Sequence, residues 1–196
     1  MRLKTLLAIG ALCVCLTATT AFAQNLVNNG SFETGDFSGW TEGGNFQFTQ
    51  VVTGPFSVYS GAEDGNFYVT MGPVGSDGTL SQTIADSAGA QYTLSFWFGS
   101  NGDNPSDFSV SWDGTNLLSL TNPNTGVNWT QFTFQVTGTG SDTLQFAFRD
   151  DPAYMALDNV SLTENSGQSV PEPSSFLLLG TGVLGLGGIA RRKLGL

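Results

Sequence analysis

The fold is decided by one short stretch, QYTLSFWF at residues 91–98. Its apolar side chains fall at every second position: Tyr92, Leu94, Phe96 and Phe98. Successive side chains of a β-strand point to opposite faces, so this spacing predicts a strand with one buried face. Trp97 is the one large aromatic residue among the alternate, polar positions, and we therefore expect it on the outer face of the strand.

The same alternation returns further along the chain. It is carried by Phe108, Val110 and Trp112, by Thr130, Phe132, Phe134 and Val136, and by Leu144, Phe146 and Phe148. Asp113-Gly114 predicts a hairpin turn, and residues 155–163 predict the last strand. Clusters of Gly, Asn, Asp, Ser and Pro separate these segments. Many short strands at this spacing predict an all-β fold, an antiparallel β-sandwich or jelly roll.

Composition narrows the classes of function. The 196 residues are enough for one domain with appendages, and they include no His, the commonest general base and metal ligand. Residues 24–169 carry fifteen acidic residues against one basic residue, Arg149, which gives this part of the chain a net charge of −14. Such a body repels phosphate backbones, so we expect no nucleic acid among its partners.

The first 23 residues predict a secretory signal peptide. Arg2 and Lys4 precede an apolar stretch, and Ala21-Phe22-Ala23 forms a cleavage site of the small-x-small type. The alternative, an uncleaved anchor, is disfavoured because the apolar stretch is short for a membrane span. Both cysteines, Cys13 and Cys15, lie inside this segment, so cleavage after Ala23 leaves no thiol and no disulfide.

The C-terminal end predicts a membrane-spanning helix. Residues 174–190 carry no charge, and at about 1.5 Å per residue they reach roughly 26 Å, enough for a thin bilayer core. The basic residues that follow place the C-terminus in the cytoplasm and the body outside it: Arg191, Arg192 and Lys193. Residues 165–170 predict a polar linker between the body and this segment.

The whole of residues 171–196 resembles the PEP-CTERM sorting signal of bacterial surface proteins. The resemblance rests on Pro171-Glu172-Pro173, the apolar run and the basic cluster, in that order. It implies a membrane protease, an exosortase, as partner, transient anchoring in the inner membrane, and a final place at the cell surface or in the extracellular matrix. Hosts of such signals typically make exopolysaccharide or biofilm. The alternative is a plain C-terminal anchor.

The body, residues 24–164, resembles galactose-binding-like jelly rolls, which include carbohydrate-binding modules. The opening stretch NLVNNGSFE at residues 25–33, followed by Gly39-Trp40, resembles their first strand. The closing stretch ALDNVSL at residues 156–162 resembles their last strand. The resemblance implies a β-sandwich with these two ends side by side, flanked here by the signal helix and the C-terminal transmembrane helix.

Many members of that fold hold a structural Ca²⁺ between the first and last strands. Carried over by position, Glu33 and Asp158 would supply carboxylate oxygens, and backbone carbonyls near Asn28 and Gly30 would complete the shell. The alternative is that Glu33 caps a turn and that Asp158 accepts hydrogen bonds from backbone amides.

A sugar platform is the second candidate site, because carbohydrate rings lie on aromatic faces while nearby polar groups bind the hydroxyls. Trp97 is the expected platform, and we expect Gln145 and Arg149, on the polar face of another strand, to reach the same concave surface. Trp129 and Tyr154 are weaker additions. The alternative is that Trp97 packs under a loop and Arg149 forms an ion pair with Asp150, Asp151 or another acid.

Taken together, these features predict an exported, exosortase-sorted surface or matrix protein that is not an enzyme and that binds exopolysaccharide. A structural or adhesive protein with protein partners is the competing interpretation. A small glycan hydrolase would need two facing carboxylates, and adjacent acids in loop-like sequence do not establish such a pair. The sequence contains no nucleophile-elbow pattern and, without His, no His-based triad.

Overall fold

The computed structural model describes residues 24–165 as a β-sandwich of ten strands. The predicted signal helix, the membrane-spanning run and the sorting residues at 171–173 and 191–193 lie outside the described residues. Between residues 24 and 165 there is no helix that could cross a membrane. The strands are β1 (Thr41–Gly44), β2 (Thr49–Thr53), β3 (Phe67–Met71), β4 (Gly78–Ala85), β5 (Gln91–Gly99), β6 (Ser106–Trp112), β7 (Thr115–Thr121), β8 (Thr130–Thr137), β9 (Ser141–Asp150) and β10 (Met155–Glu164).

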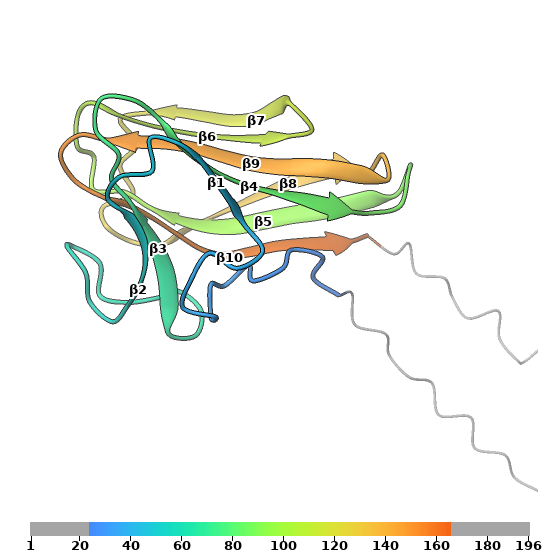
Figure 1. Cartoon of the computed structure of the whole chain (residues 1–196), viewed down its shortest axis with the longest axis horizontal. Coiled ribbons are helices and arrows are strands. Elements are labelled where there is room, and N and C mark those ends of the chain that lie inside the picture. Colours follow the sequence, from blue (N-terminus) through green and yellow to red (C-terminus); the bar gives the residue numbers. More distant parts are fainter. Residues whose placement is uncertain (1–23, 166–196) are drawn as a thin grey trace, which may run out of the picture.

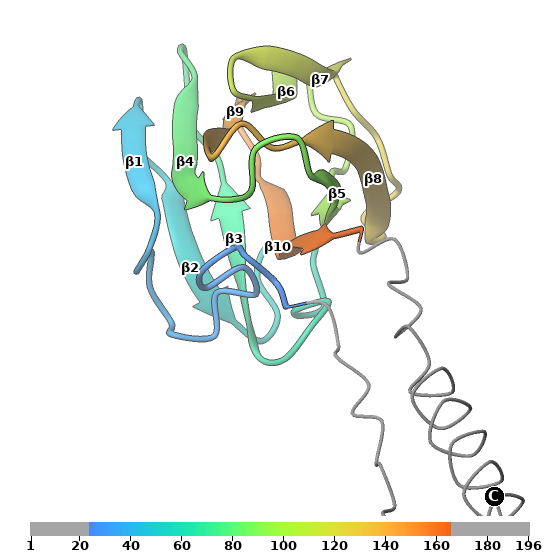
Figure 2. The same ribbon diagram turned by 90° about the vertical axis from the view of Figure 1, so that its right-hand side faces the viewer.

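The strands form two antiparallel sheets that face each other (Figures 1 and 2). One sheet has the order β1-β4-β9-β6-β7, and we call it the β9 sheet. The other has the order β2-β3-β10-β5-β8, and we call it the β10 sheet. Every strand pairing is antiparallel, so the predicted all-β antiparallel sandwich is confirmed.

Phenylalanine rings from both sheets fill the space between them. Phe96 and Phe98 of β5 and Phe108 of β6 are buried, and the ring centroids of Phe98 and Phe108 lie 4.2 Å apart. Phe146 of β9 meets Phe96 edge-on at 5.3 Å. Burial of each such ring stabilises the fold by roughly 1.5–3 kcal/mol. Because residues 24–165 contain no Cys, this burial takes the place of disulfide cross-links.

The predicted turn at Asp113-Gly114 joins β6 to β7. Both residues have positive φ, 45° and 75°, as the two central positions of a type I′ hairpin turn require. Asp and Gly are the residue types that reach this region at least cost. The turn prediction is therefore confirmed.

The opening segment differs from the expected first strand. Asn25 makes only an isolated bridge to Thr163, and the Leu26 amide donates to the carbonyl of Leu162 at 2.9 Å. The chain then enters turns, because Asn29 adopts a positive φ of 51° and its side-chain amide donates to the carbonyls of Asp36 and Ser38. The segment is thus a loop, although it does lie beside β10, as the resemblance implied (Figure 1).

Candidate functional site

Trp97 lies two residues before the end of β5, on the outer face of the β10 sheet. Its neighbours Phe96 and Phe98 are fully buried in the core, so the alternation of the strand directs the indole to the opposite side. Gln131 of β8 lies opposite Trp97 on one flank, and Asp158 of β10 lies opposite it on the other. The indole is half-buried, and no described residue accepts a hydrogen bond from its nitrogen or pairs with its ring.

Polar side chains continue from Trp97 along β5 and β8. We call this surface the Trp97 strip, and it comprises Trp97, Ser95 and Thr93 on β5 and Gln131, Thr133 and Gln135 on β8. At one end of the strip Thr93 donates to Asn165 at 2.6 Å, and the amide nitrogen of Gln135 donates to Thr93 at 3.1 Å. The Asn165 amide returns a hydrogen bond to Gln135, so the first residue of the predicted linker is held against the sheet.

A loop at residues 54–66 covers the rest of this outer face. Tyr59 of the loop lies against Gly99, where an added Cβ would approach its ring to 2.7 Å. Trp129 donates from its indole nitrogen to the carbonyl of Gly61 at 3.2 Å, and its ring lies 6.0 Å from Tyr59 and 5.7 Å from Tyr68. Trp129 directly precedes β8, and its role here is to hold the loop.

Tyr154 also belongs to this covering layer. Its ring packs edge-on against Phe56 at 5.1 Å, and its carbonyl accepts a hydrogen bond from the Tyr59 hydroxyl at 2.8 Å. Trp129 and Tyr154 therefore lie on the same side of the sandwich as Trp97, but both are engaged in packing.

Gln145 and Arg149 lie on the opposite side of the molecule, and the prediction that they share a surface with Trp97 was wrong. Both belong to β9, whose buried residues point into the core from the other sheet. Gln145 lies between Ser81 of β4 and Ser111 of β6 on the outer face of the β9 sheet. Alternation within one strand separates its two faces, but it does not reveal to which sheet the strand belongs.

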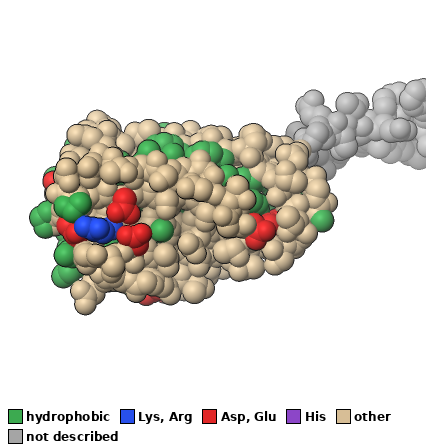
Figure 3. All heavy atoms as spheres, turned by 90° about the horizontal axis from the view of Figure 1, so that it is seen from above, with side chains coloured by type: hydrophobic (Ala, Val, Ile, Leu, Met, Phe, Trp, Pro, Cys, Tyr) green, Lys and Arg blue, Asp and Glu red, His purple; other side chains and the backbone are tan. Residues whose placement is uncertain are grey.

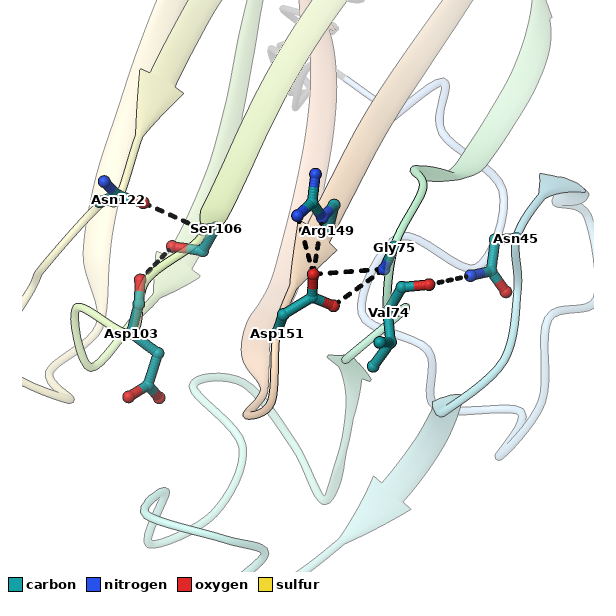
Figure 4. Close-up of polar contacts among 8 residues, drawn as sticks. All are labelled: Asn45, Val74, Gly75, Asp103, Ser106, Asn122, Arg149 and Asp151. Carbon is teal, nitrogen blue, oxygen red and sulfur yellow. Dashed lines mark hydrogen bonds and ion pairs between the residues drawn. The ribbon is translucent and has the colours of Figure 1, made fainter.

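Arg149 is held in an ion pair, which confirms the alternative considered for it. Its Nη2 lies 2.8 Å and its Nε 2.9 Å from Oδ2 of Asp151, which also accepts from the Gly75 amide (Figure 4). Asp107 of β6 lies opposite Arg149 of β9. Burial is the main cause that raises the pKa of Asp107, the Asp77 carboxylate adds to the rise, and Arg149 opposes it. Figure 3 shows acidic side chains on both sides of the basic side chain, so most of the positive charge on this face is neutralised and is not available to a ligand.

The carboxylates of Glu33 and Asp158 accept hydrogen bonds from backbone amides at the two ends of one short segment, residues 63–67. Oε1 of Glu33 accepts hydrogen bonds from the amides of Asn66 and Phe67, both at 2.8 Å. Oδ2 of Asp158 accepts from the amides of Glu63 and Asp64 at 2.8 and 3.0 Å. The Phe67 amide is the main reason why the pKa of Glu33 is lowered, whereas burial raises the pKa of Asp158 to about 7.

Each of the four residues expected to bind Ca²⁺ accepts hydrogen bonds from other described residues. The carbonyl of Asn28 accepts from the side chain of Gln82 at 2.9 Å, and that of Gly30 accepts from the Val160 amide at 2.9 Å. Oδ1 of Asp158 accepts from the Asn159 amide at 2.7 Å. Nowhere in residues 24–165 do three acidic, His or Cys side chains gather closely enough to hold a metal ion between them. The contacts match the alternative, in which both carboxylates cap backbone amides.

The family of the body follows from a comparison of its sequence with protein-family models. The model described as "Carbohydrate binding domain" matches residues 24–153, about two thirds of the chain. The chain belongs to the carbohydrate binding domain family. A second model, the PEP-CTERM protein-sorting motif, matches residues 169–193, so the predicted sorting signal is confirmed. The motif implies export and membrane-anchored sorting by an exosortase before processing.

Solved structures share the fold of this carbohydrate binding domain. TmCBM61, solved in complex with β-1,4-galactotriose, is 20% identical, with a TM-score of 0.60 over 73% of this chain and 100% of that one. The K1 cleaved adhesin domain of Lys-gingipain from Porphyromonas gingivalis W83 is 17% identical, with a TM-score of 0.53 over 67% and 96%. The CBM22-1 xylan-binding domain of Xyn10C from Paenibacillus barcinonensis is 18% identical, with a TM-score of 0.50 over 75% and 97%. No curated protein matches the chain.

The two outer faces give this carbohydrate binding domain different chemistry. The β9 sheet presents Ser, Thr and Gln with a neutralised Arg149, whereas the β10 sheet presents an indole beside amides and hydroxyls. The sequence pattern placed Gln131 and Thr133 on the polar face of their strand. It did not place them beside Trp97, because the pairing of β5 with β8 is not encoded in either strand alone.

Proposed function

We propose that this protein is a non-enzymatic, exported surface or matrix protein whose carbohydrate binding domain holds an extracellular polysaccharide. Two observations support the proposal. The body belongs to a carbohydrate-binding family, and the PEP-CTERM motif directs the chain to export and exosortase sorting. Hosts of such motifs typically make exopolysaccharide, and we therefore propose exopolysaccharide as the glycan that the domain binds after processing.

The observation that carries the binding site is the unpartnered indole of Trp97. The other half-buried aromatic rings of the described body have ring partners, as Phe132 does with Phe96 at 5.5 Å, hold a loop, as Trp129 does, or pack against the core, as Phe67 does. A sugar ring stacked on Trp97 would place its hydroxyls over Gln131 and Ser95, which offer both donors and acceptors. The strip is extended along the strands, and this shape suits a chain of sugars.

The absence of catalysis is part of the proposal, and the environment of Asp158 supports it. Glycoside hydrolysis uses two carboxylates that face the scissile bond, one as acid and one as base or nucleophile. Asp158 is the carboxylate opposite Trp97, but it is fully buried, and backbone amides bind both of its oxygens. A carboxylate held in this way stabilises the loop and has no access to a glycosidic bond.

Polysaccharide affinity electrophoresis and a glycan array test the proposal on the protein purified in detergent with its tail. Trp97→Ala is expected to weaken binding at least about tenfold, because a central aromatic contact carries much of such an interface. Gln145→Ala is the matched control on the β9 sheet and should bind as the parent does. Circular dichroism establishes that both variants fold. Unchanged binding by Trp97→Ala with a loss in Gln145→Ala would move the site to the β9 sheet, and no glycan binding by the parent would favour protein partners.

A further inference from the structure

Buried side-chain oxygens without a partner gather at one end of the sandwich. Six buried side-chain polar atoms of residues 24–165 make no hydrogen bond, and four of them belong to three residues on the β5–β6 connection and at the end of β9. These four are Oδ1 of Asn101, Oδ2 of Asp103, and Oδ1 and Oδ2 of Asp150. A buried acceptor without a hydrogen bond destabilises the fold, and a charged acceptor destabilises it more. Four such oxygen atoms in one region therefore indicate a bound group that the protein chain does not itself supply.

The topology brings these residues together from two connections. Asp150 is the last residue of β9 and lies opposite Ser106, the first residue of β6. Ser106 donates from its hydroxyl to the carbonyl of Asp103 at 2.6 Å, which ties the β5–β6 connection to this end of β9. Asn101 lies two residues before Asp103 on the same connection. In Figure 4 the carboxylate of Asp103 points away from Ser106, and no contact is drawn to it.

Asp150 is the strongest element of the cluster. It is completely buried, and neither of its oxygens has a hydrogen-bond donor. Burial raises the pKa of Asp150 to about 7, and the carboxylates of Asp103 and Asp151 add to the rise. Burial also raises the pKa of Tyr59, and Asp150 and Asp103 add to that rise. Burial is thus the main cause of both shifts, and the nearby carboxylates increase them.

We propose that Asp103, Asp150 and Asn101 form a binding site for a calcium ion. All the available ligand atoms are carboxylate or amide oxygens, the ligands that Ca²⁺ prefers. Two carboxylates would balance the charge of the ion. Arg149, the only basic residue of the body, is already paired with Asp151 and does not compete. Ca²⁺ tolerates irregular shells completed by carbonyls and water, whereas Mg²⁺ demands near-octahedral geometry.

This site is separate from the position that the family resemblance suggested. Glu33 and Asp158 have their oxygens bound to backbone amides, whereas Asp103 and Asp150 have buried oxygens that nothing binds. Asp158 lies on β10 after the β9–β10 connection, and Asp150 lies before it. Variants at the two positions can therefore be compared directly.

Calcium binding to the protein in detergent, stripped with a chelator and dialysed, tests the proposal. Isothermal titration calorimetry with CaCl₂ should give one site abolished by Asp150→Asn, and CaCl₂ should raise the unfolding temperature of the parent but not of this variant. Equal concentrations of MgCl₂ should raise it less. Asp103→Asn, which keeps Asp150, should weaken binding at least about tenfold because one ligand charge is lost.

Two control variants make the result specific. Asp107→Asn removes one negative charge from the same end of the sandwich, but Asp107 contributes none of the four buried oxygens that lack a hydrogen bond. This variant should bind Ca²⁺ as the parent does. Asp158→Asn should also retain the calcium-dependent rise in unfolding temperature. No binding by the parent would overturn the proposal, and so would binding that Asp158→Asn abolishes while Asp150→Asn and Asp103→Asn preserve it. If Asp150→Asn does not fold, Asp103→Asn decides.

Discussion

Trp97 and Asp158 lie opposite each other across β5 and β10, and the covering loop separates their environments. Asp158 is fully buried beneath residues 63 and 64, whose amides it binds, whereas Trp97 remains half-exposed at the edge of the loop. The outer face of the β10 sheet is thus divided into a covered part and an open part, with the division between these two residues. The open part is the proposed glycan surface, and its shape depends on how firmly the loop is held.

Trp129→Phe should loosen the covering loop. Phenylalanine keeps most of the packing against Tyr59 and Tyr68 but removes the donor to the Gly61 carbonyl. We expect a loss of about 1 kcal/mol in unfolding free energy, the usual worth of one hydrogen bond. Hydrogen exchange should quicken in residues 54–66 and stay unchanged in β9. Unchanged exchange in the loop would mean that Trp129 does not hold it.

Gly30→Ala should destabilise the domain strongly. A Cβ at residue 30 would collide with the carbonyl oxygen of Val160, which is backbone and cannot move aside as a side chain would. We expect a cost of about 1–3 kcal/mol from this overpacking, measured by urea denaturation. Ser31→Ala next to it removes only an exposed hydrogen bond to Asp64 and should stay within about 0.5 kcal/mol of the parent. Equal stability of the two variants would contradict the close approach of the opening segment to β10.

Stability should fall as the pH rises through the titration of Asp86. Burial raises the pKa of Asp86, and the neighbouring Asp142 raises it further. Burial opposes the ionisation of Asp142, but the Thr139 amide and Asp86 together outweigh it and lower the pKa of Asp142. A carboxyl whose pKa is higher in the folded than in the unfolded state binds its proton more tightly when folded, so folding loses free energy as the pH rises from 3.8 through that raised value.

Asp86→Asn tests this pH dependence, because its amide does not ionise and places no charge beside Asp142 at any pH. Urea denaturation between pH 4 and pH 8 should give a flatter stability profile for this variant than for the parent. Asp142→Asn is the contrasting variant, because it puts an amide where two donors from Thr139 need a carboxylate, and it should be less stable throughout. A parallel profile for Asp86→Asn and the parent would show that Asp86 does not hold the proton.

Replacing Pro171, Glu172 and Pro173 by alanine should block processing in an exosortase-containing host. The prediction follows from the matched sorting motif, residues 169–193, which contains these three residues. Mass spectrometry of the membrane fraction should then find the body still joined to residues 174–196. Replacing Ser166, Gly167 and Gln168 in the linker is the control and should leave processing intact. Normal release of the alanine variant would show that these three residues do not direct processing.

The strands that could be predicted from sequence are those with one face in the core and one in solvent. Apolar and polar residues alternate along β5, β6, β8 and β9, so the sequence alone predicts which residues share a face of each strand. β3 could not be read in this way, because the covering loop buries Tyr68 and Thr70 on its outer face as well. In β4 the buried Gln82 breaks the apolar pattern, and only the structure reveals that it bonds to both backbone groups of Asn28.

The candidate site could be predicted only in part, for a related reason. The exposure of Trp97 follows from its place among buried neighbours, and the sequence contains that information. The separation of Trp97 from Gln145 and Arg149 follows from which strands pair, and pairing depends on contacts between segments more than thirty residues apart. The cluster of Asn101, Asp103 and Asp150 is likewise a product of two distant connections, and no local pattern marks it.

The bridge between Asn25 and Thr163 sets how the domain carries a mechanical load. It fixes the beginning of the described chain beside the end of β10, so both chain ends leave from one pole of the sandwich. β10 lies in the middle of its sheet, between β3 and β5. A pull on the segment after Glu164, against a polysaccharide held at Trp97, runs along the axis of β10 and loads its hydrogen bonds to both neighbours together. Strands sheared in this way resist force better than strands that are peeled apart one bond at a time, and such resistance would suit the surface or matrix role proposed above.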